Sequence, residues 1–207
     1  MKWNPYYITT IVFCKYFFKF LCGNQIIGLE NIPPKGKFIV APNHLSHLDP
    51  PLIGGTFISR ELMFMARKTL FKPGFWNWLL SRINVIPVDK ENSAEIQSIR
   101  TAIKCLKNDM GLVIFPEGTR SIDGEIGTAQ PGLGFIAHKT QAPIIPVKII
   151  NTNKILRKNT VVPDFSQSTK IIIGKPIEFA EYASQISNAN NKYQEISDYI
   201  LNKIKTL

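Results

Sequence analysis

The stretch KFIVAPNHLSHLDPP, residues 37–51, decides the fold. Its first half is a short apolar run closed by a proline, which is typical of a buried strand. Its second half starts a helix, because proline is tolerated in a first turn, where its missing N–H has no intrahelical partner anyway. A strand that passes directly into a helix favours an α/β domain, and such junctions often hold reactive side chains.

This junction carries a histidine and a carboxylate, His44 and Asp49, with four residues between them. A neutral imidazole, with an ordinary pKa of roughly 6.5, is the natural general base at neutral pH, and a nearby carboxylate can orient it. No serine or cysteine nucleophile is needed if the substrate brings its own hydroxyl. A structural interpretation has even odds with the catalytic one: Ser46 and Asp49 are placed as N-cap residues of the following helix.

Length and composition limit the class of protein. A chain of 207 residues with 44% hydrophobic residues is expected to form one domain, or one domain with an appendage. Its net charge of +10 favours acidic partners: phosphorylated substrates, anionic lipid or nucleic acid. The three cysteines, Cys14, Cys22 and Cys105, have no metal-binding spacing, and their odd number favours a reducing compartment. We expect no metal site, and neither a Walker loop nor a dinucleotide fingerprint is present.

The first 22 residues are rich in aromatic and aliphatic side chains, with Lys15 and Lys19 at helical spacing. The apolar part, residues 6–22, is short for a membrane span, and its two lysines also argue against one. A helix lying in the membrane interface fits better, with its lysines reaching the head groups. The alternative is an amphipathic helix packed on its own domain.

Apolar strand patterns alternate with helical patterns along the rest of the chain. This alternation predicts a single α/β domain with a mixed, partly parallel sheet flanked by helices. An aromatic stretch, residues 71–80, is expected either to line an acyl pocket or to pack in the core. The predicted strands are 37–41, 62–66, 84–88, 111–115, 144–150 and 169–174, and the predicted helices 50–59, 92–108, 132–141 and 181–205.

A second group of polar residues follows the predicted strand 111–115, in the sequence PEGTRS, residues 116–121. Gly118 permits close backbone approach to a ligand, and the guanidinium of Arg120 suits phosphate. Glu117 can accept hydrogen bonds from a polyol, and Thr119 supplies a hydroxyl. Taken alone, the same residues are as compatible with a surface turn that carries an ion pair.

Together the two groups resemble the signatures of the membrane glycerolipid acyltransferases, the 1-acyl-glycerol-3-phosphate (lysophosphatidic acid) acyltransferases. The family's NHxSxxD block is matched by Asn43, His44, Ser46 and Asp49, and its FPEGTRS block is matched without change by residues 115–121, about 70 residues later. A further block, G-x-I-x-V-D-R, is matched in part by residues 84–90, with asparagine in place of glycine and lysine in place of arginine. A fourth block resembles residues 142–147.

The resemblance implies transfer of a fatty acyl group from a thioester to the free hydroxyl of a lysophospholipid, which would give phosphatidic acid. His44 would be the general base and Asp49 would orient it. A backbone N–H near Gly118 is a candidate for binding the oxyanion. The implied substrate-binding residues are Glu117, Gly118, Thr119 and Arg120, with Lys68 and Lys90 as further phosphate candidates. Taken singly, each of these two lysines fits an ordinary surface position better.

The resulting prediction is a membrane-associating helix over residues 1–24 and an acyltransferase domain over residues 25–207, at the cytoplasmic face of the cell membrane. The expected partners are a lysophospholipid acceptor, acyl-CoA or acyl-carrier protein as co-substrate, and the membrane, with no cofactor beyond the co-substrate. Other acceptors, such as another lysophospholipid or glycerol 3-phosphate, remain open, as does a non-catalytic lipid-binding protein. A nucleic-acid binder is permitted by charge, but no nucleic-acid-binding motif is present.

Overall fold

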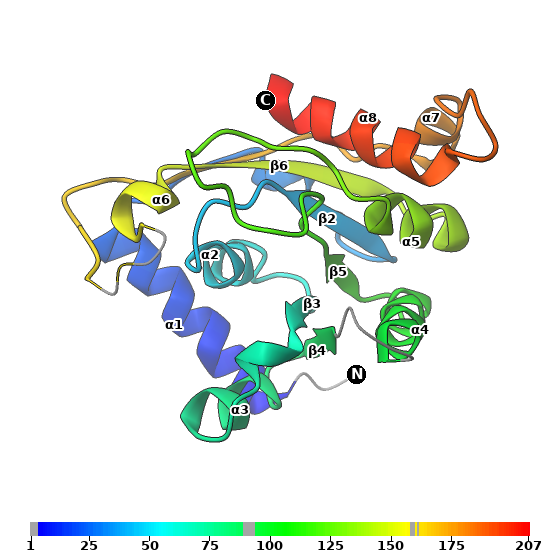
Figure 1. The fold of residues 1–207 in the computed structure, drawn as a ribbon. Helices are drawn as coiled ribbons and strands as arrows, with labels where there is room; N and C mark the ends of the chain where they lie inside the picture. Colours follow the sequence, from blue (N-terminus) through cyan, green and yellow to red (C-terminus); the bar gives the residue numbers. More distant parts are fainter. Residues whose placement is uncertain (1–3, 89–93, 158–159, 161) are drawn as a thin grey trace.

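The computed structural model describes residues 4–88, 94–157, 160 and 162–207 of the chain. Over these residues helices alternate with the strands of one sheet, which confirms the predicted single α/β domain (Figure 1). In chain order the elements are α1 (Pro5–Leu21), β1 (Gln25–Ile27), η1 (Leu29–Asn31), β2 (Phe38–Pro42), α2 (Asp49–Thr56), β3 (Leu62–Arg67), η2 (Lys68–Leu70), α3 (Phe75–Leu80), β4 (Val85–Val88), α4 (Ala94–Lys107), β5 (Gly111–Val113), α5 (Gly132–Thr140), β6 (Ile144–Ile150), α6 (Thr152–Ile155), β7 (Lys170–Ile173), α7 (Phe179–Ala183) and α8 (Lys192–Thr206).

The sheet has seven strands in the order β1-β7-β6-β2-β5-β3-β4. Strands β6, β2, β5, β3 and β4 pair in parallel with one another, and β7 pairs antiparallel with β6. The predicted mixed, partly parallel sheet is therefore correct. Because β2 lies between β6 and β5, the junction that follows it sits at the centre of the domain.

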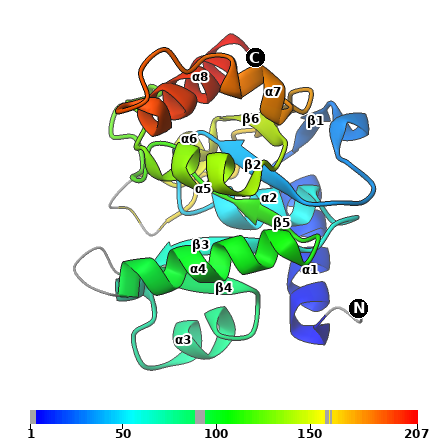
Figure 2. The same cartoon turned by 90° about the vertical axis from the view of Figure 1, so that its right-hand side faces the viewer.

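Alternate residues of the central strand feed two separate cores, one on each face of the sheet. Ile39 and Ala41 join the cluster built with α4, α5 and α8, whereas Phe38 and Val40 join the cluster built with α1 and α2. Figures 1 and 2 show α4, α5 and α8 on one side of the sheet and α1 and α2 on the other. Burial on both faces explains the continuous apolar run in this strand.

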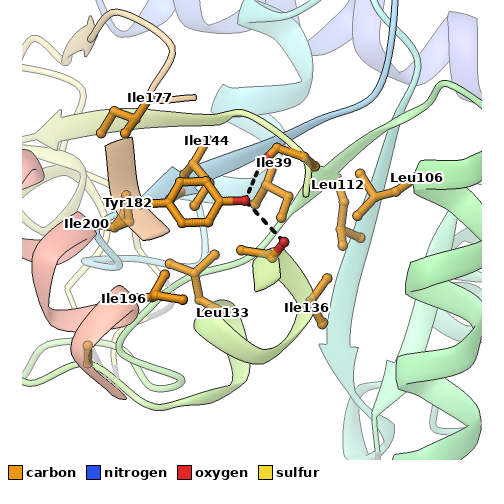
Figure 3. Close-up of a cluster of buried hydrophobic side chains, with 14 of the residues drawn as sticks. Ile39, Leu106, Leu112, Leu133, Ile136, Ile144, Ile177, Tyr182, Ile196 and Ile200 are labelled. Carbon is orange, nitrogen blue, oxygen red and sulfur yellow. Dashed lines mark hydrogen bonds between the residues drawn. The ribbon is translucent and has the colours of Figure 1, made fainter. Parts of the chain in front are cut away.

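The core under α5 and α8 is closed by Tyr182 of α7, which is completely buried. Its hydroxyl donates to the carbonyl oxygens of Ala137 and Ala142, at 3.1 and 3.0 Å, in the middle of the aliphatic cluster shown in Figure 3. Burial raises the pKa of this phenol well above its usual range. The two bonds satisfy a polar group that would otherwise be costly in an apolar site.

Helix α1 packs against α2, and its buried residues are Tyr7, Ile11, Cys14 and Phe18. The approach is close because α2 carries a glycine at the contact: a β-carbon on Gly55 would lie 2.7 Å from the backbone nitrogen of Lys15. The alternative considered for this helix, packing on its own domain, is therefore correct for one of its faces.

Several features differ from the sequence prediction, among them the short helices α3 and α6, which were not predicted. The helix expected over residues 181–205 is two helices, α7 and α8, because an asparagine-rich turn interrupts it and Glu195 of α8 accepts hydrogen bonds from the Ser187 N–H and hydroxyl. The short strand β1 was not predicted, since its three residues at the sheet edge form no recognisable pattern.

Candidate active site

The carboxyl ends of adjacent parallel strands bring together residues that are far apart in the sequence. His44 follows β2, Glu117 follows β5 and Thr152 follows β6, and these three strands are neighbours at the centre of the sheet. Strand β3, the next neighbour of β5, ends at Arg67. Open parallel sheets bind ligands at this edge, so the two sequence motifs meet where a site is expected.

His44 and Asp49 form the predicted pair. The Nδ1 atom of His44 lies 2.8 Å from Oδ2 of Asp49, with the histidine side chain 17% exposed and the carboxylate fully buried. A carboxylate oxygen can only accept, so the neutral ring carries its proton on Nδ1 and keeps a lone pair on Nε2. This tautomer is the one that a general base requires.

The capping interpretation of the junction is wrong. Helix α2 starts at Asp49 with Leu48 as N-cap, and no side chain caps it. The Asp49 carboxylate instead accepts from the backbone N–H groups of Leu45 and Ser46, at 2.6 and 2.7 Å, in the turn before the helix. The Ser46 hydroxyl donates to the Leu156 carbonyl oxygen and accepts a long bond from the Leu48 N–H.

Glu117 joins the second motif to the first. One carboxylate oxygen accepts from the backbone N–H of His44 at 2.8 Å, and the other accepts from the N–H of Gly127 at 2.9 Å. The side chain is only 6% exposed. A second bond runs the other way, from the Ser121 N–H to the His44 carbonyl oxygen at 2.8 Å. The backbone of His44 is therefore held on both sides by one loop.

An aromatic contact completes the setting of the imidazole. The ring of Phe115 is stacked on the ring of His44, with a centroid separation of 4.0 Å and an interplanar angle of 27°. Phe115 is the first residue of the second motif, so this motif contacts the side chain of His44 as well as its backbone. The ring orientation is fixed by Phe115 on one side and by Asp49 at Nδ1.

Gly118 adopts a left-handed conformation with φ of +65°, and a β-carbon there would meet Gln130 at 3.2 Å. Glycine is the residue that takes up this backbone without strain. Its own N–H donates to the Phe115 carbonyl oxygen at 3.1 Å, which removes that amide as a candidate for the oxyanion. Thr119, the next residue, is exposed at the surface of this loop.

Arg120 lies close enough to His47 to act on it electrostatically. The pKa of His47 is below its ordinary value, first because of burial and then because the positive charge of Arg120 disfavours its protonated form. His47, which follows His44 by three residues, is thus kept neutral. Arg120 is half-buried, as expected for a cation at the wall of a site rather than on a free surface.

Lys68 and Lys90 are the two further phosphate candidates predicted from the sequence. Lys68 begins the short helix η2 and is exposed. Lys90 lies outside the described residues. Arg67, the residue before Lys68, reaches the second motif, with its guanidinium 3.5 Å from the Gly118 carbonyl oxygen. Arg67 was not among the predicted substrate-binding residues, although its place beside Lys68 at a predicted strand end was a usable signal.

Comparison with known proteins gives a consistent result. A family model described as Acyltransferase matches residues 24–150. The 1-acyl-sn-glycerol-3-phosphate acyltransferase of Borreliella burgdorferi is 31% identical over 90% of this chain and 74% of its own length, and that of Bacillus subtilis is 30% identical over 78% and 77%. Against the chloroplastic enzymes of Arabidopsis thaliana and Brassica napus, the chain spans about half of their length, 49% and 50%.

A solved structure is also similar. The 1-acyl-sn-glycerophosphate (LPA) acyltransferase PlsC of Thermotoga maritima superposes with a TM-score of 0.73 at 28% identity, over 96% of this chain and 78% of that one. The match of the family model covers the strands and both motifs that build the site. The chain therefore belongs to the acyltransferase family.

Proposed function

We propose that this protein transfers a fatty acyl group from acyl-CoA or acyl-carrier protein to the free hydroxyl of 1-acyl-glycerol 3-phosphate, forming phosphatidic acid. The observation that supports the proposal is the hydrogen bond of 2.8 Å between His44 Nδ1 and Asp49 Oδ2. The backbone N–H of His44 is in turn bonded to Glu117 in the loop of residues 116–121. The nearest serine in the first motif, Ser46, is buried and its hydroxyl is bonded to Leu156. A base without a protein nucleophile suits a substrate that supplies the attacking hydroxyl.

The reaction follows from this arrangement. The acceptor oxygen attacks the thioester carbonyl carbon while His44 takes the hydroxyl proton on Nε2. Asp49 stabilises the imidazolium that forms, as in the hydrolase triads. Collapse of the tetrahedral intermediate breaks the carbon–sulfur bond, and the thiolate leaves with the proton returned by His44. The proposed chemistry needs no cofactor other than the acyl thioester itself.

The acceptor phosphate is assigned to the cationic side of the site. Arg120 is the first candidate, because a planar guanidinium binds phosphate oxygens in pairs. Gly118 and Thr119 shape the loop beside it. Arg67 joins this set, since it approaches the same loop from β3. Lys68 and Lys90 remain proposals of lower rank, and Glu117 is better placed to hold His44 than to bind a polyol.

The lipid substrate places the protein at a membrane surface, for which α1 offers an exposed apolar face. Lys15 and Lys19 flank that face, and none of the helices in the described part of the chain is long and apolar enough to cross a bilayer. Aromatic and aliphatic residues beside cations suit the interface of an anionic membrane. The exposed apolar residues of α1 are Tyr6, Ile8, Phe13, Tyr16, Phe20 and Leu21.

Two further segments extend this face. In α3, Phe75 and Trp78 are 64% and 44% exposed, so they lie neither in a core nor in a closed pocket, and Trp78 contacts Tyr6 of α1 edge to face. Phe165, in the loop after α6, makes the same kind of contact with Phe17 of α1. We propose that the combined surface of α1, α3 and this loop contacts the cytoplasmic face of the cell membrane.

One assay tests the reaction and its rivals. Purified protein is incubated with palmitoyl-CoA or palmitoyl-acyl-carrier protein and a panel of acceptors: 1-acyl-glycerol 3-phosphate, glycerol 3-phosphate and lysophosphatidylcholine. Free thiol and the new lipid are measured together. Phosphatidic acid formed with matching thiol release supports the proposal. Acylation of a different acceptor alone would replace the substrate, and lipid binding without thiol release would support a non-catalytic lipid-binding protein.

A further inference from the structure

The Asp49 carboxylate accepts a hydrogen bond from a further group besides His44 and the neighbouring backbone amides. Its Oδ2 atom receives His44 Nδ1 and the N–H groups of Leu45 and Ser46. Its other oxygen, Oδ1, accepts from the hydroxyl of Thr152 at 2.5 Å. Both Asp49 and Thr152 are completely buried. Water therefore has no access to this carboxylate, and Thr152 is the side chain that satisfies its second oxygen.

Thr152 reaches this position through the topology of the sheet. It is the first residue of α6, which follows β6, the parallel neighbour of β2. The chain turns there through Asn151 in a left-handed conformation, with φ of +69°. At the far end of the same short helix, the Leu156 carbonyl oxygen accepts from the Ser46 hydroxyl at 2.9 Å. Helix α6 thus contacts the His44–Asp49 junction at both of its ends.

We infer that Thr152 is a positioning residue for the His44–Asp49 pair, acting through Asp49 and not through the substrate. This inference rests on the proposed function, in which His44 is the base. Rotation of the carboxylate about its last bond would turn Oδ2 away from His44. The bond to Thr152 fixes the opposite oxygen, so the plane of the carboxylate is fixed. Loss of the hydroxyl leaves a buried acceptor without a partner, and the carboxylate gains by twisting toward other donors.

The test uses variants that differ in one hydroxyl. Thr152→Val keeps the shape and removes the donor, whereas Thr152→Ser keeps the donor. Thr56→Val is the matched control, because Thr56 is buried in α2 and its hydroxyl donates to the backbone of its own helix, at Leu52. Each protein is assayed for kcat and for the KM of both substrates, and its melting temperature is measured. If Thr152→Val fails to fold, Thr152→Ala and Thr152→Ser replace it as the compared pair.

We expect Thr152→Val to lower kcat roughly ten- to thirtyfold with both KM values within twofold, because a hydrogen bond to a charged group is lost away from the substrate. Thr152→Ser retains most of the turnover, and Thr56→Val lowers only the melting temperature. A kcat for folded Thr152→Val within twofold of the parent, or serine performing no better than valine, overturns the inference.

A second measurement does not depend on activity. The fall in melting temperature caused by Thr152→Val is compared in the parent and in an Asp49→Ala background. We expect the fall to be at least halved in the second background, since the partner of the hydroxyl is gone. An equal fall in both overturns the inference. If the protein acylates no acceptor in the panel, the proposed function is refuted, but the melting-temperature comparison still tests the bond between Thr152 and Asp49.

Discussion

The backbone N–H of His44 donates to the carboxylate of Glu117 at 2.8 Å, across 73 positions of sequence. Both residues belong to sequence motifs that the family resemblance assigns to the active site. Their hydrogen bond, however, holds the two loops together and does not itself involve the substrate. It ties the loop after β2 to the loop after β5 at the residue that acts as base. The first predictions concern the base itself and this contact.

His44→Ala is expected to lower kcat by about 10²- to 10⁴-fold, the range associated with a positioned general base. The fold is expected to persist, since the His44 side chain is partly exposed and makes its hydrogen bond to Asp49 at the edge of the domain core. Thiol release under saturating substrate measures kcat, and circular dichroism checks folding. His138→Ala, in α5, serves as the control histidine and should keep its turnover. A folded His44→Ala protein with near-normal activity would falsify the mechanism.

Glu117→Gln is expected to reduce both turnover and stability. The amide NH₂ group of glutamine must face one of the two backbone N–H donors, at His44 or Gly127, and that buried donor then lacks a partner. Such a loss costs about 1–3 kcal/mol of unfolding free energy. Urea unfolding and kcat are the measurements, with exposed Glu125→Gln as the matched control. A raised acceptor KM with unchanged stability would instead assign Glu117 to binding the polyol.

Arg120→Ala is expected to raise the KM for the phosphate-bearing acceptor roughly tenfold or more, with a smaller effect on kcat. A charge-assisted hydrogen bond to phosphate contributes about 1.5–3 kcal/mol, and the loss appears in binding. Arg120→Lys should recover part of this effect, because it keeps the charge without the planar fork. Arg100→Ala, on the exposed side of α4, is the control. An acceptor KM that stays the same in Arg120→Ala removes this residue from phosphate binding.

The double variant Phe13→Ser, Phe20→Ser should weaken binding to vesicles of anionic phospholipid more than tenfold. These side chains are 66% and 71% exposed on α1, and burying a phenylalanine in an apolar phase contributes about 1.5–3 kcal/mol. Co-sedimentation with vesicles is the measurement. Ile96→Ser is the control, since Ile96 is 57% exposed on α4, which lies on the opposite side of the sheet. Equal binding by the double variant and the parent would argue against α1 as the membrane contact.

Alkaline pH is expected to destabilise the fold. Burial raises the pKa of Cys14 to about 11 and that of Cys105 to about 12, from an ordinary value of 9.0. A group whose pKa is raised by folding contributes its full stability below the unfolded value and loses it as the pH rises toward the folded value. Unfolding free energy should therefore decline between about pH 9 and pH 12. Cys14→Ala with Cys105→Ala should flatten this decline, and an unaltered slope would contradict the assignment.

The sequence was sufficient for the features that depend on local pattern. The apolar run 37–41 followed by prolines predicted β2 and the start of α2, and the strand before EGTR predicted β5. The pairing of His44 with Asp49 was also accessible, because the two residues are close in the chain. The membrane role of α1, in contrast, stays a prediction, since its packing on α2 accounts for one face alone.

What the sequence did not predict depends on which strands are neighbours. The capping role given to Asp49 and Ser46 was wrong because the carboxylate binds the turn before the helix and the hydroxyl binds α6. The contact between Thr152 and Asp49 spans 103 positions, and Thr152 lies outside every motif, so only the placement of β6 beside β2 reveals it. Long-range contacts of this kind carry no local periodicity.

The close approach of α1 to Gly55 has a practical consequence for producing the protein. Cys14, Phe18 and Cys22 share one apolar cluster with Leu52, Phe57 and the central strand. Removing the first 22 residues would therefore expose the apolar inner face of α2 to solvent, and would not simply remove a membrane anchor. Biochemists seeking a well-behaved, detergent-free sample should keep α1 whole and replace its outward-facing aromatic residues, because truncation would yield an aggregating domain.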